Sequence, residues 1–131
     1  MLSSNTVSSD ESLGRYLPET SYFSASKNSV RPKAFMPPPN LRLSVFRIDG
    51  LQLEEVWEIG QREVIEAMLT PKILYGVADI KVAKVRENDL EVDPDNNPSL
   101  GHANIIGWPQ NKEKQKIIAQ SLAAEATLRL K

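Results

Sequence analysis

The chain has 131 residues, and its 16 Lys and Arg against 17 Asp and Glu give a formal net charge of −1. This length predicts one domain, and a charge near zero argues against a general nucleic-acid binder, which normally carries a basic surplus. The absence of cysteine excludes disulfides, thiolate metal sites and cysteine nucleophiles, and one histidine cannot form a zinc ligand set, so we expect neither a metal nor a cofactor.

The N-terminal segment, residues 1–12, is polar and serine-rich, which is typical of a flexible arm. It lacks the features of a signal peptide, and no apolar run in the chain is long enough for a membrane helix, so we expect a cytoplasmic protein without membrane contact. One domain is expected over residues 13–131. At its start, the apolar residues from Leu13 to Leu17 have the spacing of one helical turn, which Pro18 would end.

Residues 30–40 contain four prolines, which exclude a helix or a central strand. An extended polyproline segment of this kind can serve as a ligand for a proline-recognising domain. It can also lie over the core as a stiff strap. The neighbouring Phe35 and Met36 favour the strap, because an exposed recognition motif would not need them.

The rest of the chain alternates between strand and helix patterns. Residues 41–48 alternate with period two, and the slip at Val45-Phe46 predicts a bulge or an edge strand. Helical spacing follows over residues 53–69. Further strands are predicted at residues 73–77, 78–82, 90–92 and 102–106, a short helix at 83–89, and a last helix from about Asn111 to Leu130. This order predicts an α+β domain whose small, mostly antiparallel sheet is covered on one face by two helices.

His102 is the first candidate for chemistry, because imidazole can act as a general acid or base near neutral pH. Arg47 and Asp79 are candidate catalytic partners, and Arg31 and Tyr75 are candidate ligand-binding residues that could hold an anion. A lone histidine beside a strand is more often a structural hydrogen-bonding group. Nothing in the sequence shows that these residues converge, so both alternatives stay open.

Two features at the C-terminal end could serve a protein partner. Trp108 stands between Gly107 and Pro109, where it could either cap the core or anchor a partner. Lys112 and Lys116 make the start of the last helix basic on an otherwise acidic body. Such a helix face can be a docking surface or simply a solvated surface.

Four blocks of the chain resemble those of a small, uncharacterised bacterial protein family. The blocks read RPKAFMPPP, LSVFRIDGL, YGVADI and HANIIGWP. The resemblance covers roughly residues 13–130. It implies only a bacterial protein with a single compact domain, because no activity is assigned to the family and no site residue can be carried over.

These observations predict a non-enzymatic protein that binds another protein of unknown identity, as an accessory component of a bacterial multi-protein system. The reasons are the missing catalytic signature, the near-zero charge and a polar N-terminal arm that could become ordered on binding. The basic last helix and the proline-rich segment at residues 30–40 are the candidate contact surfaces. The alternative is a small enzyme acting on a nucleotide or another phosphate-bearing ligand through His102 and Arg47. Nucleic-acid binding through the lysines of the last helix ranks below both.

Overall fold

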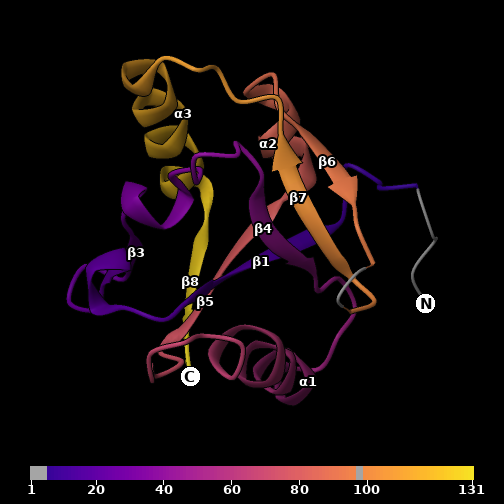
Figure 1. Cartoon of the computed structure of the whole chain (residues 1–131), viewed down its shortest axis with the longest axis vertical. Helices are drawn as coiled ribbons and strands as arrows, with labels where there is room; N and C mark the ends of the chain where they lie inside the picture. Colours follow the sequence, from indigo (N-terminus) through magenta and orange to yellow (C-terminus); the bar gives the residue numbers. More distant parts are fainter. Residues whose placement is uncertain (1–5, 97–98) are drawn as a thin grey trace.

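A six-stranded antiparallel sheet forms the frame of the molecule (Figure 1). The structure is a computed structural model, and it describes residues 6–96 and 99–131. The strands follow the order β6-β7-β4-β1-β5-β8 across the sheet. Their bounds are β1 (Ser12–Leu17), β4 (Leu43–Arg47), β5 (Gly76–Lys81), β6 (Glu91–Pro94), β7 (His102–Ile106) and β8 (Thr127–Leu130). The α+β class expected from the sequence is confirmed.

Helices and a small hairpin surround this sheet in the described part of the chain. The α-helices are α1 (Leu53–Ile59), α2 (Val82–Glu87) and α3 (Lys112–Glu125). A π-helix, η3 (Gly60–Ile65), continues α1. The hairpin strands β2 (Phe23–Ser24) and β3 (Ser29–Val30) lie between two 3-10 turns, η1 (Thr20–Tyr22) and η2 (Pro32–Phe35). In Figure 1, α3 lies at the top of the view and α1 at the bottom, with the sheet between them.

Apolar side chains pack against both faces of the sheet. On one face, η2, α2 and α3 contribute to a core that includes Phe35 and Leu122. On the other, α1 and η3 pack on a smaller core around Tyr16 and Phe46. The two longer helices expected to cover one face therefore lie on opposite faces, and α2 shares a face with α3 instead. The helical segment after residue 53 had been expected to be one of the two, and it lies on the opposite face because its apolar stripe meets this second core.

Burial on both faces explains the pattern in β4. Val45 belongs to the larger core and Phe46 to the smaller one, and both are almost fully buried. Successive side chains of a strand point to opposite faces. The slip in alternation therefore marks a central strand with two covered faces, and the prediction of a bulge or an edge was wrong.

The segment from Leu13 to Leu17 is a central strand and not the helical turn that its spacing suggested. β1 pairs with β5 along its whole length and with β4 at its start. Leu13 and Leu17 point to one face and Tyr16 to the other, and all three are buried. A spacing of three and four residues fits a helix, but it equally fits a strand that is buried on both sides.

The predicted last helix was too long at its C-terminal end. α3 begins after the N-cap Asn111, as expected, but Ala126 has extended backbone angles and the chain continues as β8. Leu128 is buried whereas Thr127 and Arg129 are exposed, so the segment alternates with the period of a strand. Pairing with β5 completes the sheet.

Residues 1–5 of the expected flexible arm lie outside the described residues, and the described part of the arm is held against the domain. Val7 is buried in the larger core. Arg86 donates hydrogen bonds to the carbonyl oxygen of Val7 and to Ser9 Oγ, at 2.8 and 2.7 Å. The packed domain therefore begins before residue 13.

The sheet opens between two of its central strands. β1 and β4 form only two residue pairs, Leu13 with Arg47 and Gly14 with Phe46, and they diverge beyond these (Figure 1). Arg47 N–H donates to Gly101, so the backbone groups of Ser44, three residues away, point towards β1 instead. β1 no longer pairs there. The opening thus leaves backbone groups in need of partners, and it positions the site described next.

Candidate functional site

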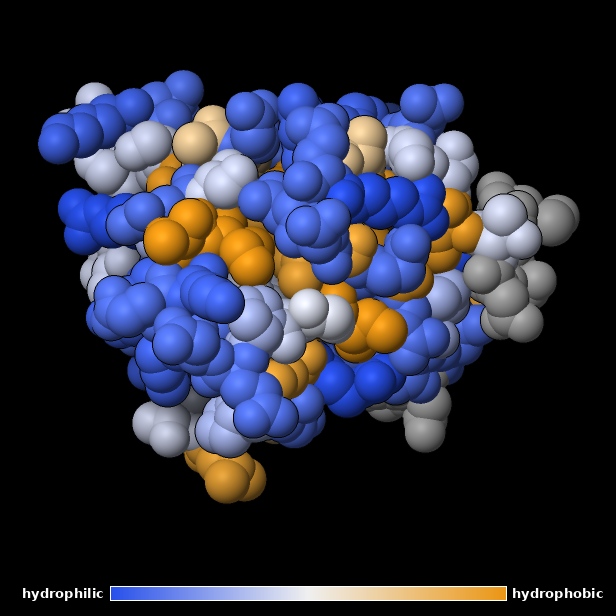
Figure 2. Space-filling model, turned by 90° about the horizontal axis from the view of Figure 1, so that it is seen from above, coloured by the Kyte–Doolittle hydropathy of each residue, from blue (hydrophilic) through white to orange (hydrophobic). Residues whose placement is uncertain are grey.

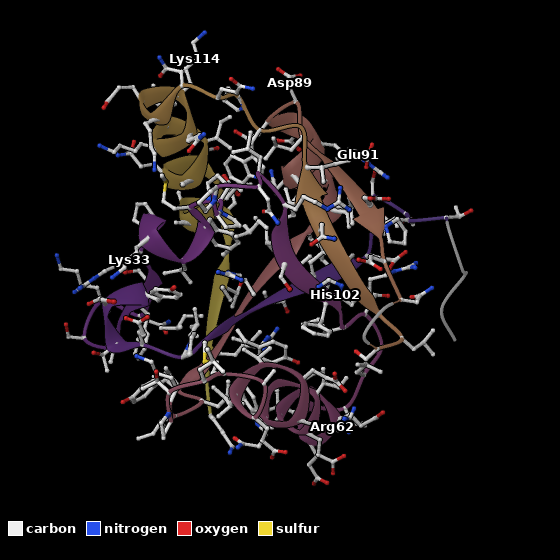
Figure 3. The ribbon with its side chains drawn as sticks, viewed as in Figure 1. Lys33, Arg62, Asp89, Glu91, His102 and Lys114 are labelled. Carbon is white, nitrogen blue, oxygen red and sulfur yellow. The ribbon has the colours of Figure 1, made fainter. Side chains whose placement is uncertain are left out.

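His102 begins β7 on the sheet face that is turned towards α1 and η3 (Figure 3). Its Nε2 lies 2.8 Å from Ser44 Oγ, and its Nδ1 lies 3.0 Å from the backbone carbonyl oxygen of Asp95. The ring also meets the Phe46 ring edge-on, with centroids 5.2 Å apart. The side chain is 12% exposed, so the imidazole is held firmly and only one side of it is accessible.

These contacts fix the tautomer of the neutral ring. A carbonyl oxygen can only accept, so Nδ1–H donates to Asp95, and Nε2 then accepts a hydrogen bond from the Ser44 hydroxyl. Ser44 and Phe46 lie two residues apart on β4, and Phe46 is directly opposite His102. The Ser44–His102 contact is therefore a diagonal pair across neighbouring strands.

A cleft of about 280 Å³ lies beside this pair, where β1 and β4 separate. Arg15 of β1 lines the cleft. Its Nε donates to the carbonyl oxygen of Ala34 at 2.8 Å, and its Nη1 donates to the carbonyl oxygen of Ser44 at 3.0 Å. The pairing of β1 with β4 stops before Ser44, so the Ser44 carbonyl has no backbone donor from β1. Arg15 supplies that donor from its side chain.

The Arg15 guanidinium carries a charge that the described residues do not balance. Its partners are two neutral carbonyls and the Tyr22 side chain, and none of the ion pairs in the described part of the chain includes it. Burial lowers its pKa from the ordinary arginine value, and the neighbouring Tyr22 side chain offsets part of this effect. A desolvated cation without a counter-charge is energetically unfavourable, so an anion in the cleft would stabilise it.

The opposite wall of the cleft is the π-helix η3 and the residues after it. Gly60 allows this wall to approach the sheet, because a Cβ at this position would lie 2.6 Å from the Tyr16 ring. The Tyr16 hydroxyl donates to the carbonyl oxygen of Val56 at 2.6 Å and fastens α1 to β1. Single π-helical turns are rare and frequent at functional sites. Apolar surface from this wall and from the sheet makes up much of the cleft, from Pro18, Phe46, Val64, Ala67 and Met68.

Glu63 brings a carboxylate into the same cleft from η3. Its side chain is 17% exposed, and its Oε1 accepts from Nε of the neighbouring Arg62 at 2.9 Å. Arg62 itself is largely exposed and points away from the sheet (Figure 3). The cleft thus has Arg15 on one wall, Glu63 on the other, and the Ser44–His102 pair between strands.

The structure does not bring the other predicted catalytic and ligand-binding residues to His102. Arg47 is buried and binds Glu11, with Nη2 2.8 Å from Oε2. Asp79 pairs with Arg129 of β8 at 3.1 Å. Tyr75 packs against Phe23, and Arg31 is exposed. None of the predicted partners lines the cleft, so the His102–Arg47 arrangement expected from the sequence is not assembled.

The predicted partner-binding residues divide between core and surface. Trp108 is only 6% exposed, and its Nε1 donates to the carbonyl oxygen of Ile105, so it caps the core and does not form an exposed anchor. Lys112 and Lys116 are exposed on α3. Figure 2 looks down on the end of the molecule where α3 lies in Figure 1, and its apolar residues form patches interrupted by hydrophilic ones.

Arg15, Ser44 and Glu63 were not identified as site residues from the sequence. The one available signal is the arginine itself, because Arg15 stands between Leu13 and Leu17 on a strand whose other residues are mostly buried. That signal requires the segment to be recognised as a strand. Ser44 and Glu63 look like ordinary polar residues of an amphipathic strand and helix, and only the fold gives them a shared cleft.

Comparison with known proteins found no matching family model, no matching curated protein and no matching solved structure. The resemblance to an uncharacterised bacterial family therefore stays a prediction. In the described part of the chain, no helix has the length and apolar character needed to cross a membrane. The same residues contain no group of three or more His, Cys, Asp or Glu side chains that could hold a metal ion.

Proposed function

We propose that this chain is a small binding protein that takes an organic carboxylate into the cleft between β1 and β4. The observation that carries the proposal is Arg15, a desolvated guanidinium that lines the cleft without a carboxylate partner among the described residues. Guanidinium groups bind carboxylates through paired, charge-assisted hydrogen bonds. A ligand carboxylate would therefore supply the counter-charge that the fold omits.

The surroundings of Arg15 define the rest of the ligand. The apolar lining, including Phe46 and Met68, suits a compact hydrocarbon body. Ser44 adds a hydroxyl oxygen that can accept one further hydrogen bond, and His102 adds the edge of an imidazole whose two nitrogens are already engaged. The cleft volume of about 280 Å³ fits a molecule of roughly amino-acid size.

Binding accounts for the geometry better than catalysis. The Ser44–His102 contact has the distance of a nucleophile–base pair. Acyl transfer also requires donors aimed at a developing oxyanion. Two backbone carbonyls fix Arg15 through Nε and Nη1 and leave its remaining N–H groups for a ligand carboxylate, while Asp95 and Phe46 hold His102 in place. These groups form a rigid recognition surface for a bound ligand.

Isothermal titration calorimetry with hydrocinnamate and its neutral amide, hydrocinnamide, tests the proposal. Both probes share one apolar frame, so their difference isolates the carboxylate. We expect hydrocinnamate to bind at least about tenfold more tightly than the amide, which corresponds to about 1.4 kcal/mol. Equal affinities for the two probes, or no binding of either, would contradict the proposal.

Substitutions locate the binding to Arg15. Arg15→Met should abolish the preference for the carboxylate, whereas Arg15→Lys should keep part of it because it retains the charge. The matched control is Arg42→Met, since Arg42 is exposed, pairs with Asp93 and lies outside the cleft. If Arg15→Met does not fold, Arg15→Lys still tests the proposal. Its preference for hydrocinnamate over the amide should be smaller than that of the wild-type chain, and an unchanged preference would contradict a role of Arg15.

The accessory role in a multi-protein system stays a prediction. Its remaining support is the exposed basic start of α3, because Trp108 is buried. A ligand-binding role is compatible with it, since the exposed start of α3 lies outside the cleft.

A further inference from the structure

The cleft contains two opposite charges that do not neutralise each other. Arg15 approaches from β1 and Glu63 from η3, and both line the same cleft. They form no ion pair, and Glu63 is not among the groups that shift the pKa of Arg15. The two charged groups therefore line one cleft without pairing with each other.

Glu63 has the features of a binding group. Its side chain is 17% exposed although it carries a charge, and its one ion-pair partner, Arg62, is 59% exposed. Ion pairs with such exposed partners contribute little to stability. The contact engages Oε1, and no hydrogen bond or ion pair of the described residues engages Oε2. A second cation on the cleft side would thus meet an acceptor with remaining capacity.

A ligand with only a carboxylate group would pair with Arg15 and leave Glu63 without a partner of opposite charge in the cleft. Its negative charge would satisfy Arg15 but would stand near Glu63, and like charges in a desolvated cleft repel each other. A ligand with an ammonium group as well would satisfy both walls. The combined charge of ligand and cleft would then be zero, with each charge opposite its complement.

Resting on the proposed function, we infer that the natural ligand class is a zwitterion of the amino-acid type. Its carboxylate binds Arg15, its ammonium group binds Glu63, and its apolar frame lies against Phe46 and Met68. The side chain of His102, whose Nε2 lies 2.8 Å from Ser44 Oγ, borders the ligand.

The experiment compares free L-phenylalanine with hydrocinnamate, which has the same frame without the ammonium group. Titration of the full chain by calorimetry should show L-phenylalanine binding at least about tenfold more tightly. A third probe, ε-aminocaproate, carries the two charges further apart. Preference for either zwitterion over hydrocinnamate supports the inference, and the preferred one gives the spacing between the charges.

Glu63→Gln separates this inference from the proposed function. The variant should bind L-phenylalanine and hydrocinnamate with equal affinity, while its affinity for hydrocinnamate stays the same or rises. The matched control is Glu66→Gln, because Glu66 is exposed just after η3 and does not line the cleft. If the wild-type chain binds hydrocinnamate as tightly as both zwitterions, the inference fails and the carboxylate site remains. If none of the three probes binds, both fail.

Discussion

Arg47 lies on β4 and Arg15 on β1, and their hydrogen-bond partners give these two arginines different roles. Arg47 binds both carboxylate oxygens of Glu11 and the carbonyl oxygen of Thr6, so its charge is balanced within the fold. This hydrogen bonding is also the main cause that lowers the pKa of Glu11 below its ordinary value of 4.5. Arg47 therefore helps to stabilise the fold, whereas Arg15 is the residue that we propose binds a ligand.

The Glu11–Arg47 pair makes stability depend on pH. Because the pKa of Glu11 is lower in the folded state than in the unfolded chain, its contribution is present above about pH 4.5 and is lost as the pH falls through the folded-state value. Glu11→Gln should lower the free energy of unfolding by about 2 kcal/mol at pH 7, because it weakens the charge-assisted hydrogen bonds between Arg47 and residue 11. The difference between the two proteins should shrink below pH 4.5.

Urea unfolding at a series of pH values measures this prediction, with Asp10→Asn as the control because Asp10 is exposed and forms no ion pair in the described structure. A constant difference between Glu11→Gln and wild type from neutral to acid pH would show that the charge of Glu11 is not what stabilises the fold.

At the residue level, the sequence placed His102 at the start of a strand but did not reveal the residues that surround it. Its place at the start of an apolar strand was recognised correctly. Arg47 was assigned to the candidate site because its ion pair with Glu11 could not be foreseen. Glu11 lies 36 residues away, in a segment whose composition suggested a flexible arm. Arg15 escaped notice because its strand was interpreted as a helical turn. Pairings over such distances have no local signal.

At the level of elements, the α1–η3 segment determines the shape of the cleft. Gly60 joins α1 to η3 with helical backbone angles, and its missing side chain leaves room for Tyr16. Tyr16 in turn lines the cleft and packs against Phe46, with ring centroids 5.7 Å apart. The distance between this wall and the sheet therefore depends on one glycine.

Gly60→Ala should lower the free energy of unfolding by about 1–3 kcal/mol, because the new Cβ would displace Tyr16 or the helix. This loss outweighs the gain of about 1 kcal/mol that alanine brings to a helix. Affinity for hydrocinnamate should fall as well. Urea unfolding and calorimetry measure the two effects, with Glu58→Ala on the exposed side of α1 as the control. Unchanged stability and affinity would show that the wall does not depend on this contact.

Most elements were predictable, and the two missed strands of the six-stranded sheet have a common cause. The strand at 102–106 was predicted with its observed bounds, and α2, β4 and β6 were predicted close to theirs. β1 and β8 were assigned to helices because their apolar spacings fit both structures. Only their pairing with β5 decides the matter, and this pairing joins residues more than 40 positions apart. Local spacing cannot reveal such contacts.

At the scale of the whole molecule, one sheet separates two cores of unequal size. Each core contacts one tryptophan: Trp108 is buried in the larger core, and Trp57 packs against the smaller one. The strands β1, β4 and β5 contribute side chains to both cores, so neither core can be lost without disturbing the other. A single cooperative unfolding transition is expected.

Single-tryptophan variants test this cooperativity. Trp57→Phe leaves fluorescence from Trp108 alone, and Trp108→Phe leaves it from Trp57. In each variant, the fluorescence midpoint in urea should coincide with the midpoint from far-ultraviolet circular dichroism. A fluorescence change of Trp57 that precedes the loss of secondary structure would show that α1 and η3 detach as a separate unit.

Carboxylate binding at Arg15 is tested most directly by following the Arg15 Nε–H signal by nuclear magnetic resonance during titration with hydrocinnamate. We expect this signal and the His102 ring signals to shift together and to saturate with one dissociation constant, while the Nε–H signal of the exposed Arg42 stays in place. Shifts that never saturate, or that affect Arg42 as strongly as Arg15, would show that the carboxylate meets only surface charges and that the cleft is not a binding site.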